Sequence, residues 1–157
     1  MINIGERIRF IRETYDLTQN DLALILKINK TSISHIERND RIIPIEHLIT
    51  FSDYLNLSID YILGLTEIKN YKDQISGIHL NKMAESIKEI CQSNHLTNLA
   101  LATIIHSCES NIRNYKNGKY LILTTFLLEL NAKYNYSIDW ILGKTTHKYV
   151  TKKLAHV

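Results

Sequence analysis

The feature that most constrains the fold of this chain is an internal repeat with a period of 79 residues. When the sequence is shifted by that distance, residues 6–66 align with residues 85–145 without a gap, and their apolar positions coincide. The two copies end alike, as Ser58-Ile59-Asp60-Tyr61-Ile62-Leu63-Gly64 and Ser137-Ile138-Asp139-Trp140-Ile141-Leu142-Gly143. Self-similarity at a fixed period is typical of repeated structural units. The repeat therefore predicts two small domains of the same fold.

In the first copy, apolar residues recur every three to four positions, as they do in short amphipathic helices. Ile4, Ile8 and Ile11 recur at helical spacing, which predicts a first helix near residues 3–15. We expect a second helix to begin at Thr18, because a Thr followed three positions later by an acidic residue is typical of a capping box.

Start and stop signals predict three further helices. Asn29 can cap a third helix over residues 30–38, and Pro44 suits the first turn of a fourth. Ser58 can cap a short fifth helix that stops at Gly64. The chain holds only five Gly and one Pro, which argues against the many tight turns of an all-β fold.

We therefore expect an all-α protein with two tandem five-helix domains joined by a short, partly helical linker. The predicted order is a first domain over residues 1–66, a linker over 67–80, a second domain over 81–145 and a basic tail over 146–157. In the linker, the spacing of Ile68, Tyr71 and Ile75 predicts a helical turn or two. The tail is expected to be frayed.

The net charge of +3 is unevenly divided along the chain. Residues 1–78 hold nine Lys and Arg against eleven Asp and Glu, whereas residues 79–157 hold ten against five. A basic half is compatible with nucleic acid binding. The surplus is small, so the case for DNA rests on where individual charges lie.

Other classes of function lack their usual sequence signals. No N-terminal secretory signal and no apolar run of about 18 residues is present, so we expect a cytoplasmic protein without a membrane partner. The mixed set Cys91, His95, His106 and Cys108 does not match a standard zinc spacing, and two cysteines give no disulfide framework. Without a phosphate-binding glycine loop or a nucleophile–base set, we expect no metal, no cofactor and no enzymatic activity.

Two segments of the first copy carry a family resemblance. They are Leu17-Thr18-Gln19-Asn20-Asp21-Leu22-Ala23 and Ile28-Asn29-Lys30-Thr31-Ser32-Ile33-Ser34-His35-Ile36-Glu37-Arg38-Asn39. Both are similar to the helix-turn-helix of the lambda repressor/Cro-like (XRE) family, and the resemblance covers nearly all of residues 3–66. It implies a sequence-specific regulator of transcription whose third helix enters the major groove of double-stranded DNA. We expect a repressor rather than an activator, because repression needs only occupancy of an operator.

The resemblance also implies which residues contact DNA. Lys30, Thr31 and His35 match positions that face base edges, where Lys can reach guanine O6 and N7 and the Thr methyl can meet thymine. Gln19 matches a position that touches phosphate or base. The remaining expected contacts of the first copy are Ser32, Ser34, Arg38 and Arg41, and the two arginines would contact the backbone. Arg12 and Glu37 match a family pair that joins the first and third helices.

The second copy keeps the core pattern and changes these exposed positions. Lys30 becomes Glu109 and His35 becomes Asn114, and both partners of the pair are replaced, by Cys91 and Lys116. Its expected DNA contacts are Asn98, Ser110, Asn111, Arg113, Asn114, Lys116 and Lys119. Two roles stay open for this copy: it contacts DNA, or it binds a protein partner, as an antitoxin-like or inhibitor protein would. Formation of a homodimer also stays open.

Overall fold

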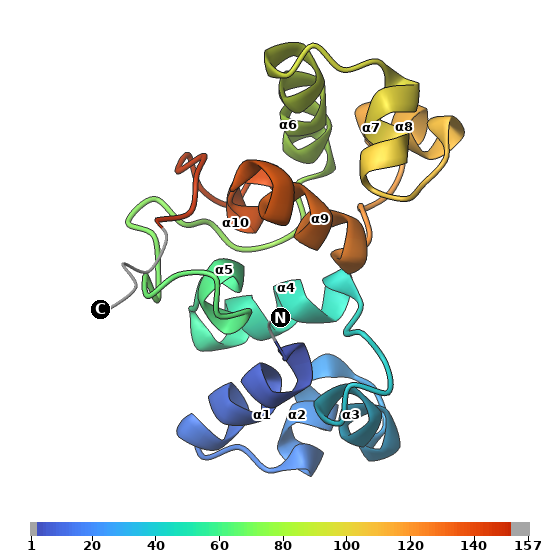
Figure 1. Cartoon of the computed structure of the whole chain (residues 1–157). Helices are drawn as coiled ribbons and strands as arrows, with labels where there is room; N and C mark the ends of the chain where they lie inside the picture. Colours follow the sequence, from blue (N-terminus) through green and yellow to red (C-terminus); the bar gives the residue numbers. More distant parts are fainter. Residues whose placement is uncertain (1–2, 152–157) are drawn as a thin grey trace, which may run out of the picture. The chain divides into compact units, whose positions relative to one another are not determined.

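The described part of the chain, residues 3–151 of the computed structural model, is all helical and contains no strand (Figure 1). The helices are α1 (Ile4–Thr14), α2 (Gln19–Leu26), α3 (Lys30–Glu37), α4 (Ile45–Leu55), α5 (Ile59–Ile62), α6 (Leu80–Ser93), α7 (Asn98–Ile104), α8 (Glu109–Lys116), α9 (Thr124–Tyr134) and α10 (Ile138–Ile141). The expected all-α class is confirmed. The chain divides into two compact units, with the boundary between Tyr71 and Lys72. Within residues 3–151, no helix combines the length and the apolar character needed to cross a bilayer.

The caps expected from the sequence start the helices of the first unit. Thr18 accepts from the Asp21 backbone N–H at 3.0 Å, and the Asp21 carboxylate accepts from the Thr18 backbone N–H at 2.8 Å, so the capping box is complete. The Asn29 side chain accepts from the Ser32 backbone N–H and so caps α3, and the Ser58 hydroxyl accepts from the Tyr61 backbone N–H and so caps α5. Pro44 precedes α4 instead of lying in its first turn, and it makes no side-chain cap.

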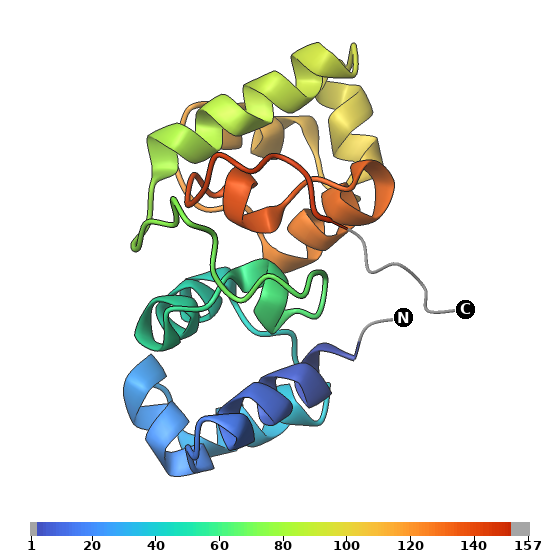
Figure 2. The same cartoon turned by 90° about the vertical axis from the view of Figure 1, so that its left-hand side faces the viewer.

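The core of the first unit is formed by the inward faces of its five helices. Ile8 and Ile11 of α1, Ile33 and Ile36 of α3 and Leu48 of α4 are almost completely buried. The helix α3 packs against both α1 and α2, as the blue helices of Figures 1 and 2 show.

The N-terminal end of α1 approaches the C-terminal end of α3 very closely. A Cβ atom added at Gly5 would lie 2.5 Å from the Ile36 carbonyl oxygen and 2.6 Å from that of Glu37. Only glycine fits at this distance, so the residue fixes where the end of α3 can lie. The second unit has Ala84 at the matching place.

The second unit repeats most helix boundaries of the first, 79 residues later in the chain, although α6 begins earlier than α1 would predict and α7 ends one residue earlier than α2 would predict. The bounds of α8, α9 and α10 are those of α3, α4 and α5 moved by this distance. Left-handed backbone conformations recur in the same way, at Asp16, Lys27, Asn39, Asn56 and Gly64 in the first unit and at His95, His106, Gly118, Asn135 and Gly143 in the second. A non-glycine residue in this conformation costs about 1–2 kcal/mol, so its recurrence reflects the same turn geometry.

The linker over residues 67–80 is not helical before Leu80, so this expectation was wrong. Its first part is held on the first unit in an extended course: the Ser58 backbone N–H donates to the Lys69 carbonyl at 2.6 Å, and the buried Tyr71 hydroxyl donates to Asp60 at 2.8 Å. One apolar anchor at Tyr71 therefore takes the place of a helical face, and Ile68 and Ile75 stay exposed.

The tail over residues 146–157 is also packed where it is described, in contrast to the frayed tail that we expected. The Ser137 backbone N–H donates to the Lys148 carbonyl at 2.9 Å, and the Val150 N–H donates to the Asn135 carbonyl at 3.0 Å. Figure 2 shows this segment, in red, running alongside α6, where Lys148 forms an ion pair with Glu89 at 2.6 Å. The rest of the expected tail, residues 152–157, lies outside the described residues.

The Asp73 carboxylate joins the first segment of the second unit to the loop after α10. The hydroxyls of Thr145 and Thr146 donate to the Asp73 carboxylate at 2.6 and 2.5 Å, and the Thr146 backbone N–H donates at 2.8 Å. These hydrogen bonds hold the pKa of Asp73 well below its usual value of 3.8, and His147 adds a favourable charge. The carboxylate is therefore bound in its charged form.

We predict that Asp73→Asn destabilises the second unit at neutral pH and reduces its sensitivity to acid. A lowered folded-state pKa gives stability that is present above about pH 3.8 and is lost as the pH falls below it. The melting temperatures of wild type and variant should therefore begin to converge only below about pH 4 and should approach each other further down to about pH 2, as circular dichroism can follow. Glu129→Gln, at an exposed acid of α9, is the control and should leave the pH profile unchanged. A constant difference across this range would contradict the assignment.

Candidate nucleic-acid interface

The short helices α2 and α3 are joined by a tight turn. The turn is made by Lys27, which takes a left-handed conformation after α2, and it leads to the cap at Asn29. Ile33 and Ile36 bury one face of α3, and this leaves the opposite face of the helix to solvent. A short helix held by two apolar anchors presents its outer side chains in fixed positions.

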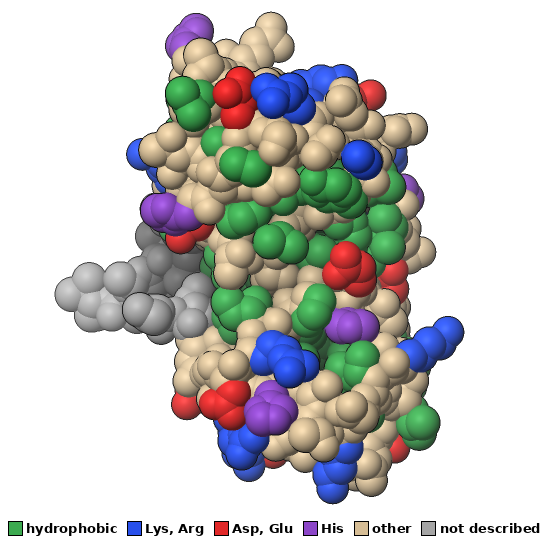
Figure 3. Space-filling model, turned by 90° about the vertical axis from the view of Figure 1, so that its right-hand side faces the viewer, with side chains coloured by type: hydrophobic (Ala, Val, Ile, Leu, Met, Phe, Trp, Pro, Cys, Tyr) green, Lys and Arg blue, Asp and Glu red, His purple; other side chains and the backbone are tan. Residues whose placement is uncertain are grey.

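The residues expected to face base edges lie on the outer side of α3. Lys30 and Thr31 are its first two residues and are exposed, and His35 lies further along and is half-buried. Among the other expected contacts, Arg38 and Arg41 are exposed, whereas Gln19, Ser32 and Ser34 are half-buried. Figure 3 shows one face of the molecule, on which Lys, Arg and His side chains lie among polar and hydrophobic ones.

An acidic residue that we did not expect orients two of these side chains. The Asp40 carboxylate lies 3.3 Å from His35 Nδ1 and 3.3 Å from Arg38 Nε. The Arg38 and Asp40 side chains are well exposed and that of His35 is partly exposed, and ion pairs of this kind contribute little to stability. Arg38 can therefore leave Asp40 for a phosphate at small cost. Asp40 follows the end of α3, where helical periodicity gives no information about which side chains meet.

The pair expected between α1 and α3, Arg12 with Glu37, is present and nearly buried. Arg12 Nε lies 2.5 Å from Glu37 Oε1, and a second Arg12 nitrogen donates to Glu37 Oε2 at 3.2 Å. The third guanidinium nitrogen donates to the Leu17 carbonyl at 2.7 Å. Arg12 therefore joins three pieces of the unit: α1, the turn before α2, and the end of α3.

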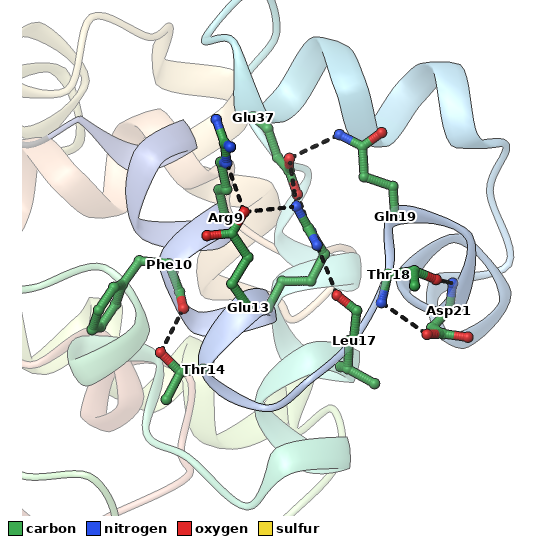
Figure 4. Close-up of polar contacts among 10 residues, drawn as sticks. Arg9, Phe10, Glu13, Thr14, Leu17, Thr18, Gln19, Asp21 and Glu37 are labelled. Atoms are coloured by element: carbon green, nitrogen blue, oxygen red, sulfur yellow. Dashed lines mark hydrogen bonds and ion pairs between the residues drawn. The ribbon is translucent and has the colours of Figure 1, made fainter.

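Gln19 extends this network toward solvent, which the sequence did not indicate. Its side-chain nitrogen donates to Glu37 Oε2 at 2.9 Å, as Figure 4 shows. One amide hydrogen is thereby used within the unit. The second amide hydrogen and the carbonyl oxygen remain for an outside partner, so Gln19 is held in position at the first turn of α2.

In the second unit, the corresponding exposed residues are tied to one another. Glu109 forms an ion pair with Arg113 at 3.2 Å along α8. The Asn114 side chain donates to the Tyr120 hydroxyl at 2.8 Å, and that hydroxyl donates to Asn111 at 3.2 Å. Among the remaining expected contacts, Ser110 lies 3.2 Å from Cys108 Sγ, Lys116 donates to Asn98 at 2.5 Å, and Lys119 is exposed. The outer face of α8 therefore differs in chemistry from that of α3.

Comparisons with known proteins agree with the geometry of the first unit. Residues 5–68 match the model of a family described as "Helix-turn-helix domain". The chain is 29% identical over 90 residues to the HTH-type transcriptional regulator ImmR of Bacillus subtilis (strain 168), covering 56% of this chain and 70% of the relative. It is 34% identical over 62 residues to the uncharacterized HTH-type transcriptional regulator YobD of the same strain, covering 40% of this chain and 55% of the relative. No solved structure matches the chain.

We predict strong coupling between Arg12 and Glu37 in the stability of the first unit. Arg12→Ala leaves a nearly buried carboxylate without its cation, which should cost about 3–5 kcal/mol. The double change Arg12→Cys with Glu37→Lys should cost less than the sum of the single changes, because the second unit holds Cys91 and Lys116 at these places. Chemical denaturation of the four proteins measures the coupling free energy.

The exposed pair Glu109–Arg113, at 3.2 Å on the surface of α8, is the control for this cycle, because neither residue contacts Arg12 or Glu37. Its coupling should stay below about 1 kcal/mol, since solvent screens exposed pairs. Equal coupling for the two pairs would show that Arg12 and Glu37 do not hold α3 in place.

Proposed function

We propose that this protein is a sequence-specific DNA-binding regulator of transcription that reads the major groove with α3 of its first unit. The observation that carries the proposal is the locked position of α3. Its inner face is anchored by two buried isoleucines and its C-terminal end by the Arg12–Glu37 pair, while Lys30, Thr31 and His35 face outward. The match of residues 5–68 to the helix-turn-helix family supports the same role.

In this proposal the contacts divide into two kinds. Lys30, Thr31 and His35 read base edges, helped by Gln19 and by two serines of α3, Ser32 and Ser34. Arg38 and Arg41 contact phosphates and position the helix without reading sequence. We further propose that the protein acts as a repressor in the cytoplasm, since bound α3 can block an operator without a second activity.

We also propose that the second unit is a diverged copy of the first, so that the chain carries two tandem domains. The helix bounds and left-handed residues that recur at one spacing support this view. The extended segments after α5 and α10 make the same contact, from Ser58 to Lys69 and from Ser137 to Lys148. The two domains therefore extend beyond residues 66 and 145, to Tyr71 and Val150.

The second unit has a different part in this proposal. Arg113 and Lys119 are exposed and can add contacts to DNA phosphates, whereas Glu109 and Asn114 do not repeat the first unit's pattern. One observation favours the alternative, in which this unit binds a protein partner: Glu109 places a carboxylate where Lys30 lies in the first unit, and a carboxylate is repelled by phosphates. Whether two copies of the chain bind one operator is a further proposal, which the symmetry of selected sites would test.

We predict that Lys30→Ala and His35→Ala each weaken specific DNA binding by about 1–3 kcal/mol while the fold is kept. Both side chains are on the outer face of α3, so their removal takes contacts from DNA and leaves the core intact. Fluorescence anisotropy with a selected site measures the affinity, and circular dichroism measures the helical content. Lys69→Ala, at an exposed lysine beside Tyr61 of α5, is the matched control. Unchanged affinity in both α3 variants would refute the base-reading role.

A further inference from the structure

The second unit contains a pocket at the place where the first unit has its buried ion pair. The pocket has a volume of about 430 Å³ and lies among α6, the start of α7 and the end of α8. It is lined by Lys88, Cys91, Gln92, His95, Leu96, Thr97 and Lys116. Every one of these residues belongs to the second unit, so the site is complete within it.

At this place the second unit has different side chains from those of the ion pair in the first unit. Arg12 of the first unit corresponds to Cys91, whose side chain is shorter, uncharged and buried. Glu37 corresponds to Lys116, which turns to Asn98 at 2.5 Å. In the first unit, a smaller pocket of about 270 Å³ overlaps the corresponding place, and it is lined by Arg9, Arg12, Gln19, Ser34, Glu37 and Arg38.

The same replacements reverse the charge of the site. In the first unit, the five charged residues at these positions are the basic Arg9 and Arg12 and the acidic Glu13, Asp16 and Glu37. Their counterparts in the second unit are Lys88, Cys91, Gln92, His95 and Lys116. Two positive and three negative charges thus become two lysines and a histidine with no acid.

Neither lysine of the pocket forms an ion pair within the described part of the chain. Among residues 3–151, no carboxylate lies within ion-pair distance of Lys88 or Lys116. Lys116 has Asn98 Oδ1 as its hydrogen-bond partner, and an ammonium group carries three donors. Surface lysines are common, but two that form no ion pair and line the same open, shallow site give that site a positive potential.

We propose that this pocket is a binding site for a phosphate group. The ammonium groups of Lys88 and Lys116 would balance the charge of the phosphate, and the Gln92 amide and the Thr97 hydroxyl supply further donors at the rim. A phosphate offers several acceptor oxygens around one centre, which suits several donors that line the same pocket. A carboxylate offers less charge and fewer acceptors to the same set.

The phosphate can belong to the DNA backbone or to a small phosphorylated compound, and the chemistry of the pocket serves both. For DNA, the inference rests on the proposed function and adds a defined contact by the second unit. For a small compound, it gives the protein an effector site that is separate from the outer face of α3. The two possible sources of the phosphate can be distinguished experimentally. Replacing the pocket lysines should change the salt dependence of DNA binding only if the phosphate belongs to DNA.

The first test titrates the full-length protein with pyrophosphate in a chloride buffer of low ionic strength, followed by isothermal calorimetry. We expect saturable binding to one site per chain, weakened at least tenfold in Lys88→Gln/Lys116→Gln. Lys133→Gln, at an exposed lysine of α9 outside the pocket, should bind as the wild type does. The change Cys91→Arg/Lys116→Glu rebuilds the ion pair of the first unit, and it should abolish binding while thermal melting confirms the fold.

The second test measures the affinity for duplex DNA at several salt concentrations, with the same full-length variants. If the pocket holds a DNA phosphate, Lys88→Gln/Lys116→Gln should lower the slope of log affinity against log salt by about 0.9 per lost phosphate contact, and pyrophosphate should compete. If it holds a small compound, pyrophosphate should bind and the slope should stay unchanged. Absence of saturable binding together with an unchanged slope would overturn the proposal. Lys30→Ala should weaken specific binding in either case, so failure of the pocket and failure of base reading are distinguishable.

Discussion

The buried pair of Arg12 and Glu37 is the interaction on which the arrangement of the first unit depends. A helix of eight residues such as α3 has little stability of its own, so its position is set by what it packs against. Ile33 and Ile36 fix one face, and the ion pair fixes the C-terminal end to α1 and to the turn before α2. Desolvation offsets much of the attraction in a buried pair, so its contribution is to position more than to stabilise. The Gln19 contact carries this positioning to the first turn of α2.

The second unit shows what the same helices do without that pair. Its α8 keeps the bounds expected from α3, and Ile36 is replaced there by Tyr115, which is 2% exposed and whose burial raises the pKa of its hydroxyl to about 12. The aromatic side chain and the buried Cys91 thus fill the core by apolar packing. The fold of the unit therefore does not require the ion pair. What the exchange changes is the chemistry of the surface above it, from a network that holds Gln19 to a basic pocket.

Much of this architecture could be predicted from the sequence, because helix caps and apolar periodicity act over a few residues. Thr18, Asn29 and Ser58 cap the helices that their positions predict. The prediction of a helical linker was wrong. It rested on the apolar spacing of Ile68, Tyr71 and Ile75, but only Tyr71 is buried, and its hydroxyl bonds to Asp60 of the first unit, a contact that the spacing does not encode. The contact of Gln19 with Glu37 joins residues 18 positions apart on different helices, and local patterns do not encode such pairs. The outer residues of α3 were placed by family resemblance, and their contacts with DNA remain a prediction.

Selection of bound sites from a random pool of duplex DNA tests the central proposal most directly. The full-length protein should enrich a discrete sequence motif, since a rigidly held α3 presents Lys30 and His35 to a fixed set of base edges. The same selection with Lys30→Ala should relax the preference at one part of the motif and leave the rest. Enrichment of no motif, or of an identical motif by the wild type and the variant at every position, would contradict the proposal that α3 reads DNA.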